Sequence, residues 1–134
     1  MRAMLHDGNG ALRHLNNLFA GFITPNTMYN EDVNPVIETP LAAATSIQEM
    51  LIQSHDGIID VFPAVPDKWS EVKFETFRAW GGFEISAEKK NGKTAYITVK
   101  NLCGQKCFIK ADVELDYRKM TADYMKFRLR KAKA

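Results

Sequence analysis

The sequence predicts an α+β protein in which an N-terminal helical segment is followed by an antiparallel β sandwich. Up to about residue 55, apolar residues recur every three or four positions, which is the spacing of one helix face. Beyond Gly57 they alternate along short segments bounded by turn residues, as in half-buried strands. This change of periodicity divides the chain into residues 1–55 and 56–134.

Size and charge limit the classes of function. A chain of 134 residues is about the size of one domain or of two small parts. The formal net charge of +2 creates no strong field, so we expect neither nucleic acid nor a membrane as a partner. No apolar run approaches the roughly 20 residues needed to span a bilayer, and residues 1–10 contain no signal-peptide core.

The first helix is predicted over residues 11–22, after a turn cluster at residues 7–10 that can cap it. Its apolar stripe has spacings of three and four and comprises Leu12, Leu15, Leu18, Phe19 and Phe22.

Residues 23–36 are predicted to form a loop, because they are rich in turn formers and have no clear periodicity. The connection is longer than usual between helices, and such loops often hold binding residues. The side chains that could supply polar groups to a pocket are Asn26, Tyr29, Asn30 and Glu31. A merely solvated loop is the alternative.

The second helix is predicted to start with Thr39 as N-cap and Pro40 at the first helical position. It should run for about four turns along the stripe of Leu41, Ala44, Ile47 and Leu51. Three small residues at 42–44 would let a neighbouring helix approach closely, as in a larger helical assembly.

Glu38 precedes this helix, where the partial positive charge of the N-terminus favours an ionised carboxylate. That position suits a residue of a functional site. Acidic residues are common at helix starts, and spacing alone favours this simpler explanation.

Strands are predicted from alternating apolar residues over residues 58–62, 72–80, 83–90, 94–100, 107–115 and 124–130. Asn91-Gly92 is a strong hairpin signal between two of them. Residues 117–131 could instead form a helix, but the alternation of Met125, Phe127 and Leu129 favours a strand. Six strands with frequent turns indicate an antiparallel sandwich.

Cys103 and Cys107 flank a three-residue segment. In a hairpin they could face each other and form a disulfide, or they could be two ordinary half-buried cysteines. Two cysteines and three distant histidines have no recognised metal-ligand spacing, so we expect no metal and no cofactor.

Several separated motifs follow one another along the chain. They are Ile37-Glu38-Thr39-Pro40-Leu41, residues 47–57, residues 62–69 and the Phe-Arg-Ala-Trp-Gly-Gly-Phe segment at 77–83. Together they resemble the C-terminal end of glycoside hydrolase family 95, the α-L-fucosidase family, in the family's order and over nearly the whole chain.

The resemblance implies that residues 1–55 are the last helices of an (α/α)6 barrel and residues 56–134 the closing β sandwich. Glu38 would match the acidic residue that helps to activate the attacking water in an inverting hydrolysis. The general acid would lie upstream, so the chain would be inactive alone and would need the missing N-terminal barrel portion.

The resemblance also implies an oligosaccharide substrate and a periplasmic or secreted full-length parent. The family motif Asp-Gly-Asn-Phe-Gly is replaced here by residues 38–42, which leaves the sugar specificity open.

A second hypothesis is a non-catalytic module that binds carbohydrate or protein through Trp69, Trp80 and Tyr96. Exposed helices could also support a homo-oligomer.

Overall fold

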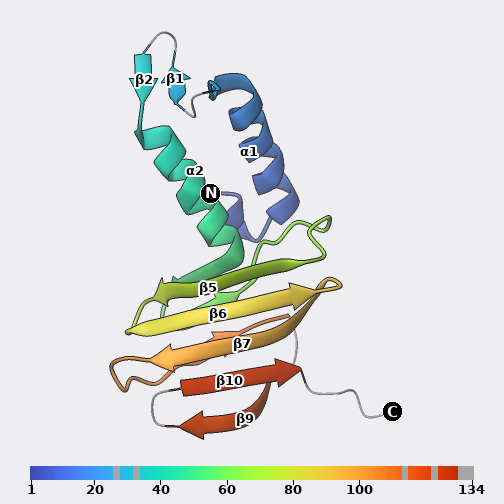
Figure 1. Ribbon diagram of the computed structural model, residues 1–134, viewed down its shortest axis with the longest axis vertical. Coiled ribbons are helices and arrows are strands. Elements are labelled where there is room, and N and C mark those ends of the chain that lie inside the picture. The colour runs from blue at the N-terminus through green and yellow to red at the C-terminus, as the bar shows by residue number, and fades with distance from the viewer. Residues whose placement is uncertain (26–27, 32–33, 113–114, 122–123, 130–134) are drawn as a thin grey trace.

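The computed structural model describes residues 1–25, 28–31, 34–112, 115–121 and 124–129, with side chains up to residue 112. Over these ranges the protein is α+β, with two α-helices and mostly antiparallel sheets. The helices lie beyond the edge of the larger sheet that is formed by β5 (Val72–Ala79) (Figure 1). The N-terminal elements are η1 (Ala3–Leu5), α1 (Gly8–Phe22), β1 (Tyr29–Glu31), β2 (Asn34–Val36) and α2 (Glu38–Leu51).

Helix α1 begins immediately after Asp7, whose carboxylate accepts a hydrogen bond from the backbone N–H of Gly10 at 2.8 Å. This hydrogen bond, followed by one from Arg2, lowers the pKa of Asp7. The predicted helix is confirmed, and the turn cluster supplies its first residues as well as its cap.

Helix α2 has the expected length of about four turns but begins earlier than predicted. Thr39 as the N-cap is wrong, because Ile37 occupies that position without a side-chain hydrogen bond. Pro40 is therefore the third helical residue. The first four N–H groups of a helix have no intrahelical acceptor, so the missing N–H of Pro40 costs no helix hydrogen bond there.

Strand β3 (Ile52–His55) follows α2 directly and was not expected. It pairs with β4 (Ile58–Val61) through a turn at Asp56 and Gly57, both of which have positive φ. The change from helix to sheet thus occurs at Leu51, before the predicted boundary at residue 55.

The larger sheet has five antiparallel strands in the order β5-β6-β7-β10-β9. The strands are β5 (Val72–Ala79), β6 (Phe83–Lys90), β7 (Lys93–Asn101), β9 (Leu115–Thr121) and β10 (Tyr124–Leu129). Four predicted strands are confirmed as β4, β5, β6 and β7. The fifth, over residues 124–130, is confirmed as β10 up to Leu129, and residue 130 lies outside the described residues.

The smaller sheet has the order β3-β4-β8, and β8 (Phe108–Lys110) runs parallel to β4. The predicted strand over 107–115 is therefore shorter within the described residues, and its residues 113 and 114 lie outside them. An exclusively antiparallel arrangement is wrong for this pair. Local alternation of side chains cannot specify the direction of a partner 50 residues away.

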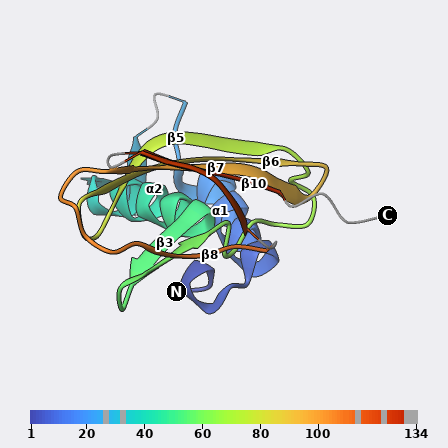
Figure 2. The ribbon, with the colours of Figure 1, turned by 90° about the horizontal axis from the view of Figure 1, so that it is seen from below.

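The two sheets face each other (Figure 2), and apolar side chains from both fill the space between them. Ile52, Ile59 and Val61 come from the smaller sheet. Phe74, Phe83, Ile85, Ala87, Ile97 and Val99 come from the larger sheet.

A second apolar cluster joins η1 and the two helices to the segment after β4. Its buried members are Ala3, Ala11, Leu15, Ala43, Met50 and Ala64. The Asn9 and Asp67 side chains add hydrogen bonds between α1 and this segment.

Neither helix of the described part of the chain has the length and apolar character needed to cross a membrane.

Candidate functional site

Glu38 lies exposed in the first turn of α2. The unpaired N–H groups of this turn stabilise a negative charge there. The carboxylate is therefore open to solvent, as a residue that meets a ligand must be.

The predicted binding residues lie in a hairpin of β1 and β2, where a loop without regular structure was expected. The strands have three residues each, too few for alternation to be recognised. Tyr29 is buried, with its ring centroid 5.7 Å from that of Phe22, whereas Asn30 is half-buried and Glu31 is exposed. Asn26 lies outside the described residues.

The hairpin lies at the end of the helix pair where α2 begins (Figure 1), and Glu38 is the first residue of α2. Tyr29 pairs with Val36, only two residues before Glu38. The fold thus brings the described candidates near one another, although Tyr29 packs mainly against α1.

An open cavity of about 510 Å³ lies between α1 and α2. Its lining is largely apolar and includes Ala11, Leu15, Leu18 and Ala43, with Thr39 and His14 among the polar members. Thr39 follows Glu38 directly in α2, so the cavity reaches the end of the helix at which the carboxylate lies.

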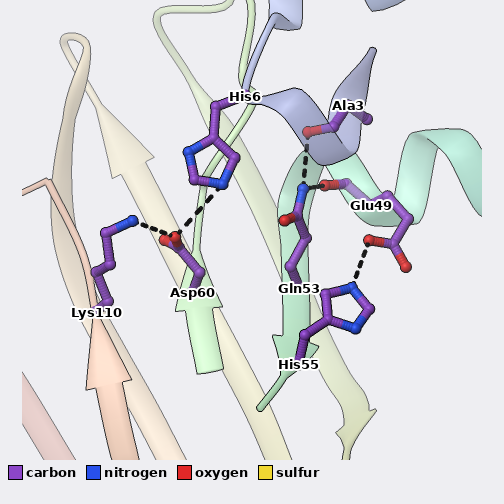
Figure 3. Close-up of polar contacts among 7 residues, drawn as sticks. All are labelled: Ala3, His6, Glu49, Gln53, His55, Asp60 and Lys110. Atoms are coloured by element: carbon purple, nitrogen blue, oxygen red, sulfur yellow. Dashed lines mark hydrogen bonds and ion pairs between the residues drawn. The ribbon is translucent and has the colours of Figure 1, made fainter. Parts of the chain in front are cut away.

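Gln53 joins the helical part to the smaller sheet (Figure 3). Its buried amide donates hydrogen bonds to the carbonyl oxygens of Ala3, at 2.8 Å, and Glu49, at 3.0 Å. Beside it, His55 Nε2 lies 3.4 Å from the Glu49 carboxylate.

Asp60 forms a second connection in the same region (Figure 3). Its carboxylate lies 2.7 Å from Lys110 Nζ and 3.8 Å from His6 Nε2. These contacts link η1, β4 and β8. The sequence contained no signal for them, because their partners are about 50 residues apart.

A smaller pocket, of about 100 Å³, lies where the end of α2 meets the end of β5. Its lining is mainly polar and comprises Gln48, Glu49, Ile52, Ser54, His55, Arg78 and Trp80. Trp80 is 82% exposed, and its backbone N–H donates to the Ser54 hydroxyl at 3.0 Å. We refer to this feature as the Trp80 pocket.

The three aromatic residues of the second hypothesis do not form one surface. Trp69 packs against the helical cluster. Tyr96 is five residues along β7 from Asn101, whereas Trp80 lies at the Asn101 end of the sheet. At about 3.3 Å per residue, this separation is about 16 Å along the strand.

Cys103 and Cys107 are both free thiols, so of the two alternatives the structure has unpaired cysteines and not the disulfide. Cys103 is exposed, while burial raises the pKa of the Cys107 thiol to about 11. Among the described residues, no group of three or more His, Cys, Asp and Glu side chains is arranged to hold a metal ion.

Comparison with known protein families finds one match over most of the chain. Residues 53–133 match the family model described as glycoside hydrolase family 95, C-terminal domain. A search of curated proteins found no match. The matched region begins in β3, so α1 and α2 precede it.

Proposed function

Because this chain belongs to glycoside hydrolase family 95, with the C-terminal domain of that family over residues 53–133, we propose that it is the C-terminal part of an α-L-fucosidase-like enzyme. Its helices would be the last helices of an (α/α)6 barrel, and its two facing sheets the closing β sandwich. Hydrolysis of the glycosidic bond would proceed with inversion at a site completed by upstream polypeptide.

The observation that carries this proposal is the pair of helices that directly precedes the matched domain. These helices leave large apolar side chains exposed at the end near Glu38: Phe22 is 50%, Ile37 68% and Leu41 60% exposed. Such surfaces are expected of helices that pack against other helices. The open cavity between α1 and α2 is consistent with an incomplete helical assembly.

We assign to Glu38 the activation of the attacking water, and to Asn26, Tyr29, Asn30 and Glu31 contacts with the substrate. Inverting hydrolysis ordinarily needs an acid and a base whose carboxyl groups are about 6.5–9.5 Å apart. The acid would come from the upstream barrel. Glu38 alone could not complete the reaction.

The proposal can be tested by producing the chain alone and together with a polypeptide that supplies the upstream barrel. We expect hydrolysis of an aryl α-L-fucoside only by the reconstituted pair. Glu38→Gln should lower kcat by about 10²- to 10⁴-fold, the usual contribution of a general base. Glu71→Gln, an exposed carboxylate before β5, is the matched control and should keep full activity.

Hydrolysis by the isolated chain, or full activity of Glu38→Gln in the pair, would contradict the assignment. An active pair that cleaves a different aryl glycoside would retain the reaction class and change only the sugar.

A further inference from the structure

We propose that the Trp80 pocket binds one neutral sugar residue, with the sugar ring stacked on the exposed indole and its hydroxyl groups directed into the pocket. This inference does not rest on the proposed role of Glu38. The two sites are at opposite ends of α2, and the 11 residues from Glu38 to Glu49 span about 16 Å of helix.

The backbone of Trp80 is held in a defined position, although the side chain is 82% exposed. Ser54 in β3 accepts a hydrogen bond from the Trp80 backbone N–H. The two glycines that follow, Gly81 and Gly82, have positive φ and turn the chain into β6. An anchored and exposed tryptophan presents a flat apolar face to a ligand at little entropic cost.

Hydrogen-bonding groups surround this apolar face. Glu49 provides carboxylate acceptors, and Arg78 provides guanidinium donors. The His55 imidazole and the Ser54 hydroxyl lie beside them. A ligand with one apolar face and hydroxyl groups around its edge matches this arrangement, because each hydroxyl can both donate and accept.

The positive and negative charges near the pocket balance, which favours a neutral ligand. Glu49 lies 3.4 Å from His55 Nε2. Arg78 lies 3.0 Å from the Glu84 carboxylate, and Lys100 lies 3.4 Å from it. The two carboxylates of Glu49 and Glu84 balance the two cations of Arg78 and Lys100, so this group as a whole has no net charge that would select a phosphate or an ammonium group.

The volume of the Trp80 pocket determines which part of the ligand can enter it. At about 100 Å³ the pocket is smaller than the cavity of roughly 150 Å³ that holds a benzene ring, and a sugar ring with its hydroxyl groups is larger than benzene. The pocket thus accepts hydroxyl groups but not a whole ring. The ring must lie outside it, against the indole.

Binding can be measured on the chain itself by saturation-transfer NMR with methyl α-L-fucoside, methyl β-D-galactoside and methyl β-D-glucoside. We expect saturable binding of at least one glycoside in the millimolar range, as is usual for a small ligand in a shallow site. Trp80→Ala should weaken it at least about tenfold by removing the stacking surface. Glu49→Gln should weaken it to a smaller extent.

Phe108→Ala is the matched control, because Phe108 is 62% exposed and lies on β8 in the smaller sheet. It should leave the affinity unchanged. Adenosine, which has a flat aromatic base, tests whether any flat molecule binds to the Trp80 indole. The proposal is overturned if no glycoside binds saturably, if Trp80→Ala binds as well as the parent chain, or if adenosine binds as tightly as the best glycoside.

Discussion

At the scale of single residues, Cys103 and Cys107 are close in sequence but differ in their surroundings. Cys107 has a pKa of about 11, so about one thiol in a thousand is ionised at pH 8. Because the thiolate is the reactive form, iodoacetamide should modify the exposed Cys103 first and leave Cys107 protected. Peptide mass spectrometry over a time course measures both rates.

Unfolding the protein in denaturant provides the control, since both thiols should then react at similar rates. Equal rates in the folded protein would contradict the burial of Cys107.

Gln53 contributes to stability through its two hydrogen bonds at the junction of helix and sheet. Gln53→Met keeps the length of the side chain but removes both donors, leaving the Ala3 carbonyl without this partner. We expect the free energy of unfolding to fall by about 1–3 kcal/mol, measured by urea denaturation. Gln48→Met, at an exposed position of α2, should change it by less than about 0.5 kcal/mol.

Asp112 should make stability depend on pH in the acid range. Burial raises its pKa, but hydrogen bonds from Thr94 and Lys89 outweigh this effect, and the net pKa lies below its usual value. A depressed folded-state pKa stabilises the protein above the unfolded pKa, near 3.8, and this stability is lost as the pH falls through the folded value.

Asp112→Asn should therefore be less stable than the parent chain at pH 7, and the difference should shrink at pH 3. Urea denaturation at the two pH values measures it. Asp56→Asn, an exposed turn substitution, is the control. A difference that grows at pH 3 would show that the carboxylate is not stabilised by its partners.

At the scale of elements, the two ends of α1 should respond oppositely to the same substitution. A Cβ at Gly8 would overlap the carbonyl oxygen of Ala64, whereas a Cβ at Gly21 would meet no atom of the described structure within 4 Å. Gly8→Ala should cost about 1–3 kcal/mol through overpacking. Gly21→Ala should gain up to about 1 kcal/mol through helix propensity.

Thermal denaturation of the two variants tests this prediction, with each variant serving as the control for the other. Equal effects at both positions would mean that the start of α1 does not pack closely against the segment after β4.

Turn chemistry explains both a success and a failure of the sequence analysis. Asn91 and Gly92 have φ values of 49° and 73°, which fit the two-residue turn predicted between β6 and β7. Asp56-Gly57 is a similar signal, and it joins β3 to β4. It could have revealed β3, but the helical spacing of apolar residues before it favoured a continued helix.

At the scale of the whole molecule, the apolar end of the helices should govern association. We expect an Ile37→Ser/Leu41→Ser double variant to lose the ability to pair with the upstream barrel polypeptide. It should also lose any self-association of the isolated chain. Both side chains are largely exposed, so the fold itself should persist. Analytical ultracentrifugation measures both kinds of association.

Phe108→Ser removes an exposed aromatic from the smaller sheet and is the control. Unchanged association of the double variant would move the interface away from the helix ends.

The sequence by itself determined the order and type of most elements, because side-chain spacing and turn residues act over only a few positions. It also located Glu38 at the start of a helix and revealed the family resemblance. Only the tertiary structure decided the parallel pairing of β4 with β8, the hydrogen bond from Gln53 to Ala3, and the hydrogen bond from Trp80 to Ser54. These contacts join residues 26 to 50 positions apart, and they form because distant apolar faces pack together, which no local pattern encodes.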